Sequence, residues 1–448
     1  MVLHVLDALA AAGVQRPVVV IGHGAGAVQQ AVADRADCVV QAEQLGTGHA
    51  VLQTQACVAG ADAGHLLVVN GDLPLVLPAT LQALMAQHTT TGAAVTIAGR
   101  VTAIVEEKAA TPEQQAITEI NVGVYAFALP WLWQALQALE PSAVGEYYLT
   151  DVVAAAIAQG STVAAAPLTE PTEAQGINDR VQLAAAEAVV RQRIRTRLML
   201  AGVTMIDPAS TFVDAEVEVA ADTTLLPNTM LSGRTTVGSG CRIGPGAVIR
   251  DTRIGDRCLV GQSTLEEAVV EADTDIGPYC HLRPGAHVGP HVHLGNYVEI
   301  KNSRVRSRTA VGHFSYLGDA DVGESVNIGA GTITCNYDGQ AKHRTVIGDG
   351  AFVGSDSMLV APVTIGAAGG AALATLPRHR RPGGERPVPT AVLEWAAYHR
   401  TRLEPTLLVV QTTGLVVLTT TLGHNLFEAQ GPSGEMALLT ALTAIVLT

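Results

Sequence analysis

The middle of the chain repeats an aliphatic residue every six positions, from Leu231 to about Ile365. A period of six matches neither the helical nor the alternating strand pattern. It favours a β-solenoid in which each hexad forms one short, flat face of a triangular prism, with the aliphatic side chain inside. The repeat positions are Leu231, Val237, Ile243, Ile249, Ile254, Val260, Ile276, Leu282, Val288, Leu294, Ile300, Val305, Val311, Leu317, Val322, Ile328, Ile347, Val353, Leu359 and Ile365.

Glycine follows many of the repeat residues, as in Val237-Gly238, Ile254-Gly255 and Val311-Gly312. We expect these glycines at tight corners, where a Cβ would clash. Solenoids with hexad repeats coil left-handed, against the usual crossover rule. Many of them transfer acyl groups and form parallel trimers with active sites between neighbouring prisms. Because a fold alone does not determine a function, this association sets only an expectation.

Composition narrows the class of protein. The 448 residues are enough for two or more domains, and 48% of them are hydrophobic but only 4% aromatic, as suits a core of stacked aliphatics. The net charge of −14 argues against nucleic acid and anionic membranes as partners. The six cysteines form no C-x-x-C pair, and the first residues lack a charged-then-apolar leader. We therefore expect a cytoplasmic protein with free thiols.

The first part of the chain alternates helical and strand patterns. His4 to Gly13 is typical of an amphipathic helix, and Pro17 to Ile21 and Leu66 to Val69 are typical of buried strands. Strands that alternate with helices predict a parallel, doubly wound sheet. Ligands of such sheets bind at the carboxyl ends of the strands, where Asp72 is expected to lie.

We predict four segments from these patterns. A nucleotidyltransferase-like α/β domain, Rossmann-like but incomplete, covers residues 1–180, and a linking helix covers 181–205. The left-handed parallel β-helix covers 206–366. The tail at 367–448 is assigned no role.

Several strings identify a family. They are Gln41 to Ala50 (QAEQLGTGHA), Asn70 to Pro74 (NGDLP), Gly145 to Tyr148 (GEYY), Leu282 to Ala286 (LRPGA) and Asn336 to Gly339 (NYDG). With these strings the chain resembles the bacterial bifunctional N-acetylglucosamine-1-phosphate uridylyltransferase/glucosamine-1-phosphate N-acetyltransferase family. That family makes the amino-sugar nucleotide for peptidoglycan and lipopolysaccharide. The resemblance implies acetyl-CoA, UTP and sugar phosphates as ligands, Mg²⁺ as cofactor, and a homotrimer.

The resemblance also implies an acetyl-transfer site in the solenoid. His313 stands at the family's general-base position, and a neutral imidazole suits the removal of a proton from an attacking amine. Cations and a phenol suit a phosphate inside an acidic protein. The residues implied for glucosamine-1-phosphate are Arg283, Lys301, Tyr316, Asn327 and Lys342. Those implied for acetyl-CoA are Ala330, Asn336, Tyr337 and Ser355.

A second site is implied in the first domain. Asp72 and Asn178 are the implied ligands of Mg²⁺. The residues implied for the nucleotide sugar are Gln41, Gly46, Thr47, Asn70, Gly71, Asp72, Glu106, Asn121 and Asn178.

The first domain departs from the family pattern. The printed sequence begins after the family's Gly-rich phosphate loop and its lysine, and the Pro-Thr-Gly-Tyr-Gly-Arg-Ile segment is missing near Gly99. Because nucleotidyl transfer depends on fixing the phosphates, we expect an impaired uridylyltransferase site. A central strand should also be missing, which leaves two unpaired strand edges. After about Ile365 the sequence no longer follows the family's final coil.

Three other interpretations remain. The chain could be an inactive, truncated solenoid that only trimerises, and binding of acetyl-CoA distinguishes this case. It could be a uridylyltransferase with a purely structural solenoid, which the missing loop disfavours. It could also be a solenoid zinc hydratase with histidine ligands from neighbouring subunits, since histidines cluster at His281, His287, His291 and His293. The strings around these histidines match the transferase family instead.

Overall fold

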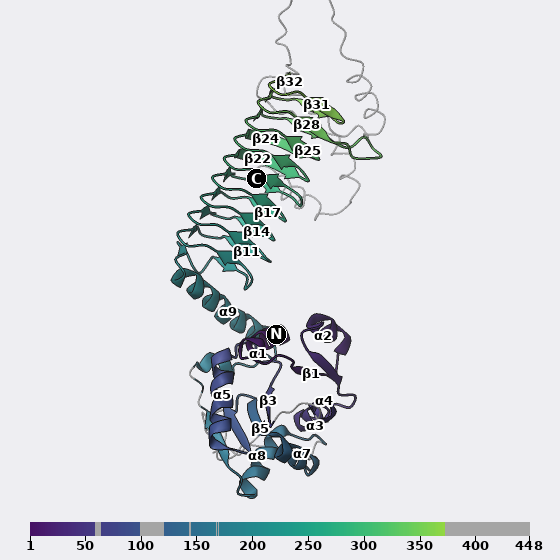
Figure 1. Ribbon diagram of the computed structural model, residues 1–448, viewed down its shortest axis with the longest axis vertical. Coiled ribbons are helices and arrows are strands. Elements are labelled where there is room, and N and C mark those ends of the chain that lie inside the picture. Colours follow the sequence, from purple (N-terminus) through teal and green to yellow (C-terminus); the bar gives the residue numbers. More distant parts are fainter. Residues whose placement is uncertain (59–63, 99–120, 143–144, 167, 169, 372–448) are drawn as a thin grey trace, which may run out of the picture. The chain divides into compact units, whose positions relative to one another are not determined.

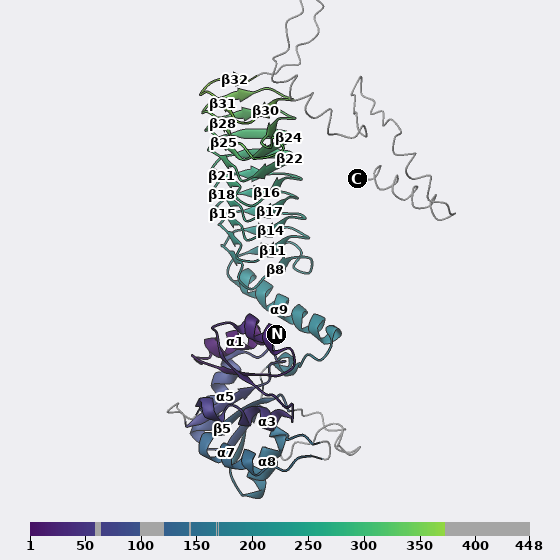
Figure 2. The same cartoon turned by 90° about the vertical axis from the view of Figure 1, so that its right-hand side faces the viewer.

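The computed structural model describes residues 1–58, 64–98, 121–142, 145–166, 168 and 170–371 (Figures 1 and 2). Glu106, the segment near Gly99 and nearly all of the C-terminal tail lie outside these residues. No helix in the described ranges is long and apolar enough to cross a membrane.

The N-terminal part is an α/β domain. Its helices are α1 (Val2–Ala11), α2 (Ala25–Val32), α3 (Thr47–Leu52), α4 (Gln55–Val58), α5 (Pro78–Thr91), α7 (Leu129–Gln137), α8 (Leu149–Ala158) and the 3₁₀ turn η2 (Pro171–Ala174). Its strands are β1 (Val18–Ile21), β2 (Asp37–Val40), β3 (His65–Val69), β4 (Val95–Ala98), β5 (Val124–Ala128) and β6 (Val163–Ala166). The fully buried Phe127 and Leu132 belong to a core that β4, β5, α7 and α8 share.

The strands do not form the single parallel sheet that the sequence pattern predicted. β1 and β2 pair in parallel as a separate two-stranded sheet, and the other four strands have the order β3-β5-β4-β6. β5 runs antiparallel to both β3 and β4, so this second sheet is mixed. β1 and β3 each have one edge without a partner strand among the described residues, and so do β2 and β6, the other outer strands of the two sheets.

The linking helix is α9 (Arg180–Leu200). It begins at Asp179, whose carboxylate accepts a hydrogen bond from the Gln182 N–H at 2.8 Å and so caps the first turn. Ile194 and Leu198, near its C-terminal end, are buried in the core of the solenoid. The helix is shorter than the predicted 181–205, because Gly202 takes a left-handed conformation (φ 97°) and a strand follows.

The solenoid is the left-handed parallel β-helix that the hexads predicted, with three faces. The first face contains β7 (Thr204–Met205), β10 (Thr224–Leu225), β13 (Arg242–Ile243), β16 (Leu259–Val260), β19 (Asp275–Ile276), β26 (Asn327–Ile328), β29 (Phe352–Val353) and β32 (Gly370–Ala371). The second contains β8 (Phe212–Val213), β11 (Met230–Ser232), β14 (Val248–Arg250), β17 (Thr264–Glu266), β20 (His281–Leu282), β27 (Ile333–Cys335) and β30 (Met358–Val360). The third contains β9 (Glu218–Val219), β12 (Thr236–Val237), β15 (Arg253–Ile254), β18 (Val269–Val270), β21 (His287–Val288), β23 (Arg304–Val305), β25 (Ala320–Val322), β28 (Thr345–Ile347) and β31 (Val363–Ile365).

Two long strands join the first and second faces. β22 (His293–Lys301) and β24 (Ala310–Gly318) each run along both faces and around the corner between them. They pair with each other in parallel from His293 and Ala310 onwards. They carry several of the candidate site residues.

The aliphatic repeat residues fill the interior of the prism. Leu231, Ile243, Leu282 and Val311 are fully buried, and all belong to one continuous core. Removal of each such side chain from water contributes about 1.5–3 kcal/mol. The glycines after them are also needed: a Cβ on Gly238 would lie 2.6 Å from the backbone of Gly255 in the next coil. The close approach of successive coils therefore requires glycine at this corner.

Candidate functional site

Three cations gather at one edge of the second face. Arg283 directly follows β20, Lys301 ends β22, and Lys342 lies in the segment 336–344 between β27 and β28. The Arg283 guanidinium donates to the Glu299 carboxylate at 2.8 Å. The neighbouring Lys342, and then Arg283, lower the pKa of Lys301, because like charges on this exposed face repel one another. Such a cluster is suited to bind a dianionic phosphate.

Tyr316 lies beside this cation cluster. It pairs in register with Glu299 on the neighbouring strand. Its side chain extends over Gly318, where an added Cβ would lie 2.2 Å from the phenol oxygen. Glycine at position 318 therefore leaves the space that the tyrosine occupies.

Asp319 connects the cluster to the segment 336–344. Its carboxylate accepts hydrogen bonds from the amides of Asn302 and Asn336. Burial alone would raise the pKa of Asp319, but these two hydrogen bonds and the charges of Lys342 and Lys301 together hold it below its usual value. Asn336 is itself buried. The carboxylate thus remains charged and fixes the start of the segment.

The segment 336–344 is ordered by its own polar groups. Asp338 accepts hydrogen bonds from the backbone N–H groups of Gln340 and Ala341, each at 2.8 Å, and its other oxygen is 2.7 Å from His343 Nε2. These bonds to the ionised carboxylate lower the pKa of Asp338 far below its usual range. Tyr337 forms a bridge with Lys342, and 56% of Tyr337 is exposed, so its ring is open to a ligand.

A second group of candidates lies at the corner between the first and second faces. His313 in β24 pairs in register with Asn296 in β22, and its Nδ1 is 2.8 Å from the Asn296 side-chain oxygen. Ala330 follows on the next coil, since Tyr316 pairs with Ile333 at the same spacing. Ser355 comes after it: its N–H lies 2.5 Å from the position of a Cβ on Gly329. These residues form a column along the prism.

The Ala330 N–H has a feature that suits a reacting carbonyl. It donates to no acceptor in the described part of the protein, although the Ala330 carbonyl accepts from the Asp356 N–H at 2.7 Å. A backbone donor that is free and only partly exposed is able to stabilise a developing oxyanion.

Asn327 is not brought to the cation cluster. It lies on the first face, where it pairs with Ala310 and Phe352, and its side chain is exposed. Among the described residues, no hydrogen bond joins it to Arg283, Lys301 or Lys342. One copy of the chain therefore distributes the implied sugar-phosphate residues over two faces.

In the N-terminal part, two family strings meet. The Gly48 N–H donates to the Tyr147 carbonyl at 2.8 Å, and the Thr47 hydroxyl accepts from the Leu149 N–H at 3.0 Å. Gly46 has a φ of 94°, and a Cβ there would lie 2.6 Å from the Tyr147 carbonyl oxygen. Gln41 reaches the same turn and donates to the Gly46 carbonyl at 3.1 Å. The implied base-binding residues thus form one ordered turn.

The remaining N-terminal candidates follow β3 or precede β5. The Asn70 N–H donates to the Gly123 carbonyl at 3.1 Å, and Asn121 donates through its amide to the Tyr125 hydroxyl. Gly71 and Asp72 come directly after Asn70. Glu106 lies outside the described residues.

Asp72 and Asn178 fit the implied Mg²⁺. The Ile177 N–H donates to the Asp72 carbonyl at 3.1 Å, and a Cβ on Gly176 would lie 3.5 Å from an Asp72 carboxylate oxygen. This brings the carboxylate close to the segment that ends in Asn178, whose side chain is exposed. One carboxylate and one amide oxygen match Mg²⁺, which keeps several waters and substrate phosphates as its other ligands.

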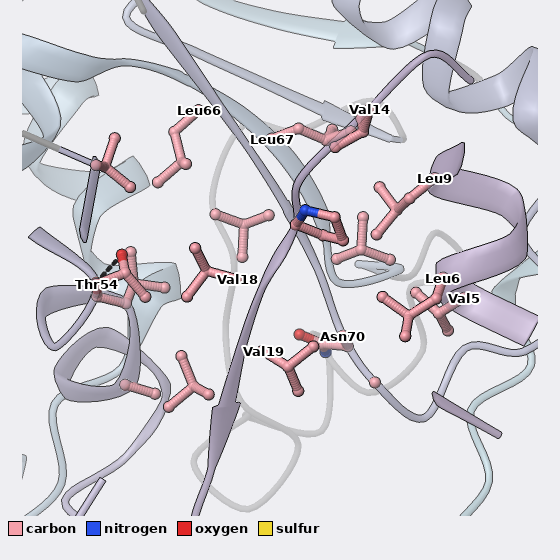
Figure 3. Close-up of a pocket in the computed structure, with 18 of the residues that line it drawn as sticks. Val5, Leu6, Leu9, Val14, Val18, Val19, Thr54, Leu66, Leu67 and Asn70 are labelled. Atoms are coloured by element: carbon pink, nitrogen blue, oxygen red, sulfur yellow. Dashed lines mark hydrogen bonds between the residues drawn. The ribbon is translucent and has the colours of Figure 1, made fainter. Parts of the chain in front are cut away.

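An apolar cavity of about 560 Å³ lies between β1 and β3. Figure 3 shows Leu6 and Leu9 of α1 on one side of it and Thr54 on the other. Val18 and Val19 of β1 and the chain at Asn70 also line it. The cavity thus lies between β1 and β3, which do not pair with each other.

The histidines of the zinc hypothesis lie at the strands β20 to β22. His281 is 3.1 Å from Glu266, His287 is 2.6 Å from Glu271, and His293 is 2.5 Å from Asp275. These three histidines thus each pair with one acid of the preceding coil. Within the described residues, no three His, Cys, Asp or Glu side chains form a group that could hold a metal.

Sequence reasoning did not find four polar residues that contact the candidates or one another. They are Asn296, Glu299, Asn302 and Asp319. Each lies one coil away from its partner, and only the strand register shows this. A signal was present in the hexads, because Asn296 and His313 both stand two residues after an aliphatic repeat position.

Comparison with known proteins agrees with these two parts. Residues 1–164 match the family of MobA-like NTP transferase domains. The bifunctional protein GlmU of Heliobacterium modesticaldum is 48% identical over 386 residues, which are 82% of this chain and 84% of that protein. The GlmU proteins of Trichlorobacter lovleyi and Brevibacillus brevis are 46% and 42% identical, over 81% and 82% of this chain and 83% of each relative. The chain therefore belongs to the bifunctional GlmU family, the uridylyltransferase and acetyltransferase family that its sequence strings resemble.

Proposed function

We propose that this chain transfers the acetyl group of acetyl-CoA to the amine of glucosamine-1-phosphate, with His313 as general base. One observation carries the proposal: Lys301 and His313 lie on the paired strands β22 and β24, and Arg283 and Lys342 lie on segments next to these strands. A phosphate-binding cluster near a base suits a substrate that has both a phosphate and an amine.

The phosphate is bound by Arg283, Lys301 and Lys342. Glu299 holds the Arg283 guanidinium in place, and Asp319 partly offsets the charge of the two lysines. Without a substrate the lysines repel each other, so a phosphate dianion relieves that repulsion when it binds. Tyr316 adds a hydroxyl donor over Gly318.

The acetyl transfer then proceeds by direct attack. The amine nitrogen forms a bond to the thioester carbonyl carbon while His313 takes its proton through Nε2. The free Ala330 N–H stabilises the carbonyl oxygen as it gains charge. The C–S bond breaks, and the thiolate of CoA leaves and takes up a proton. Asn336, Tyr337 and Ser355 are the proposed CoA contacts.

A homotrimer would complete this site. Asn327 lies on the first face and the cations lie on the second, so a neighbouring prism is needed to bring them to one substrate. We propose that the acetyl-transfer site lies between copies, with Asn327 from one and the cation cluster from another.

The polypeptide printed here is proposed to have a weak uridylyltransferase site. Residues 1–180 contain one lysine, Lys108, which lies outside the described residues. Among the described residues before Arg180, the two arginines are Arg16 and Arg35, and each pairs with an aspartate. No free side-chain cation is thus left there to fix a triphosphate. Asp72 and Asn178 would hold Mg²⁺, which would neutralise phosphate charge when bound.

Two expectations remain part of this proposal. The enzyme works in the cytoplasm, where its free thiols stay reduced. Its domains are residues 1–180, the linking segment 181–205, the β-helix 206–366 and the tail 367–448.

Release of CoA thiol tests the acetyl-transfer proposal. The purified chain should release thiol from acetyl-CoA when glucosamine-1-phosphate is added, and much less when glucosamine is added. Equal rates with both sugars would contradict the role of the cation cluster. No release with either sugar would contradict the function itself and favour the inactive solenoid.

A further inference from the structure

Asn296 is the described side chain that contacts the His313 imidazole. The two residues lie opposite each other in the parallel pair β22–β24, at the corner where both strands turn from the first face to the second. The Asn296 Oδ1 atom is 2.8 Å from His313 Nδ1. His313 is exposed, and Asn296 is only partly so.

This contact selects one tautomer of the imidazole. An amide oxygen accepts hydrogen bonds and cannot donate them. The Nδ1 atom must therefore carry the hydrogen, and the lone pair of a neutral ring is then on Nε2. With the opposite tautomer, Nδ1 and the amide oxygen would place two lone pairs against each other.

We propose that Asn296 is a positioning residue that holds His313 with Nε2 free to accept the proton of the attacking amine. This inference rests on the proposed acetyl transfer and adds to it a residue outside the implied site. Asn296 touches the base and not the reacting atoms, so its effect is expected in the orientation and tautomer of the imidazole.

The other described titratable groups near His313 do not contact its imidazole, so Asn296 is the residue that can orient it. Besides His313, the titratable groups on the two strands are His293, Tyr297, Glu299 and Lys301 in β22 and Tyr316 in β24, and Asp356 follows two coils further on. Glu299 is bonded to Arg283, and Asp356 contacts the Ala330 carbonyl through its backbone. In the described part of the chain, none of these six donates to or accepts from the imidazole.

Two substitutions show whether Asn296 orients the His313 imidazole or only supports the fold. Asn296→Ala removes the acceptor and should lower kcat for acetyl transfer about 10- to 100-fold, the range for loss of a partner that orients an imidazole. The KM values for both substrates should change little. Asn296→Asp keeps the shape and the acceptor but adds a charge that stabilises the imidazolium. The acidic limb of its kcat profile should therefore move to higher pH by roughly one unit, with activity recovered above the limb.

Asn228→Asp is the matched control. Asn228 occupies another corner of the prism, on an earlier coil, and also becomes a carboxylate. It should leave the pH profile unchanged. Thermal unfolding of all three variants shows whether each remains folded.

Three outcomes would overturn the inference. Wild-type kcat in Asn296→Ala would show that the imidazole needs no partner. A pH limb in Asn296→Asp that coincides with that of Asn228→Asp would show that the carboxylate does not reach the base. Absence of acetyl transfer in the wild type would overturn the proposed function and this inference together, whereas an active wild type with unmoved profiles would overturn this inference alone.

Discussion

The Tyr316 phenol lies directly over Gly318, so that a Cβ on the glycine would stand 2.2 Å from the phenol oxygen. Gly318→Ala should therefore push the tyrosine away from the cation cluster without disturbing the buried core. We expect the KM for glucosamine-1-phosphate to rise about tenfold, the effect of losing roughly 1.4 kcal/mol of binding. Steady-state thiol release measures it. Gly366→Ala, where a Cβ meets no atom within 4 Å, is the control and should leave KM unchanged.

Replacement of the proposed base tests the chemistry. His313→Ala should lower acetyl transfer by about 10²–10⁴, the usual range for a general base. Because the imidazole is exposed, the variant should keep the thermal unfolding midpoint of the wild type. Unchanged turnover at saturating substrates would remove His313 from the mechanism.

The cation cluster should act on binding more than on the chemical step. Arg283→Ala and Lys342→Ala should mainly raise the KM for the amino-sugar phosphate, since a phosphate contact is made in ground and transition states alike. Arg304→Ala, on the exposed surface of the third face, is the matched loss of one positive charge. A similar rise in KM for all three variants would mean that net charge, and not the cluster, attracts the substrate.

The positions inside the prism were predictable from the sequence, but the contacts between coils were not. Leu231 and Ile365, the first and last repeat residues, are both buried, because a period of six fixes which side chain faces inward. The separation along the sequence between residues that stack on successive coils varies. It is 18 residues from Asp275 to His293 and 25 residues from Asn327 to Phe352. A constant spacing therefore does not give every stacked pair, although the shared position after an aliphatic repeat residue is a signal for Asn296 and His313.

The sequence also did not show that β5 runs antiparallel to its neighbours. Val124 to Phe127 are all buried, so the strand lacks the alternation that would show a solvent-facing side. An apolar strand of this kind fits a parallel or an antiparallel position equally well. The sequence therefore indicated the helix at His4 to Gly13 and the strands at Pro17 to Ile21 and Leu66 to Val69, but not the mixed sheet to which β5 belongs.

The segment 336–344 should lose its order in acid. Backbone hydrogen bonds from Ala341 and Gln340, and the contact with His343, lower the pKa of Asp338. A carboxylate with a lowered pKa adds stability that is present above its ordinary pKa of about 3.9 and is lost as pH falls below that value. Hydrogen exchange in the segment should thus be protected at neutral pH. Asp338→Ala should remove that protection and speed trypsin cleavage after Lys342; equal cleavage rates would contradict the role of Asp338.

The last prediction concerns the N-terminal domain of the polypeptide printed here. It should release little or no pyrophosphate from UTP and N-acetylglucosamine-1-phosphate, because both arginines described before Arg180 pair with aspartates and leave no free side-chain cation there to hold the triphosphate in line for attack. The apolar cavity between β1 and β3 should also make residues 1–180 easier to digest than the β-helix, since two unpaired edges open more readily than a continuous stack of coils. Limited proteolysis followed by mass spectrometry measures the order of cleavage. Pyrophosphate release at a rate near that of acetyl transfer, and abolished by Asp72→Ala, would show that the turn at Gly46 and the Mg²⁺ ligands suffice without a Gly-rich phosphate loop.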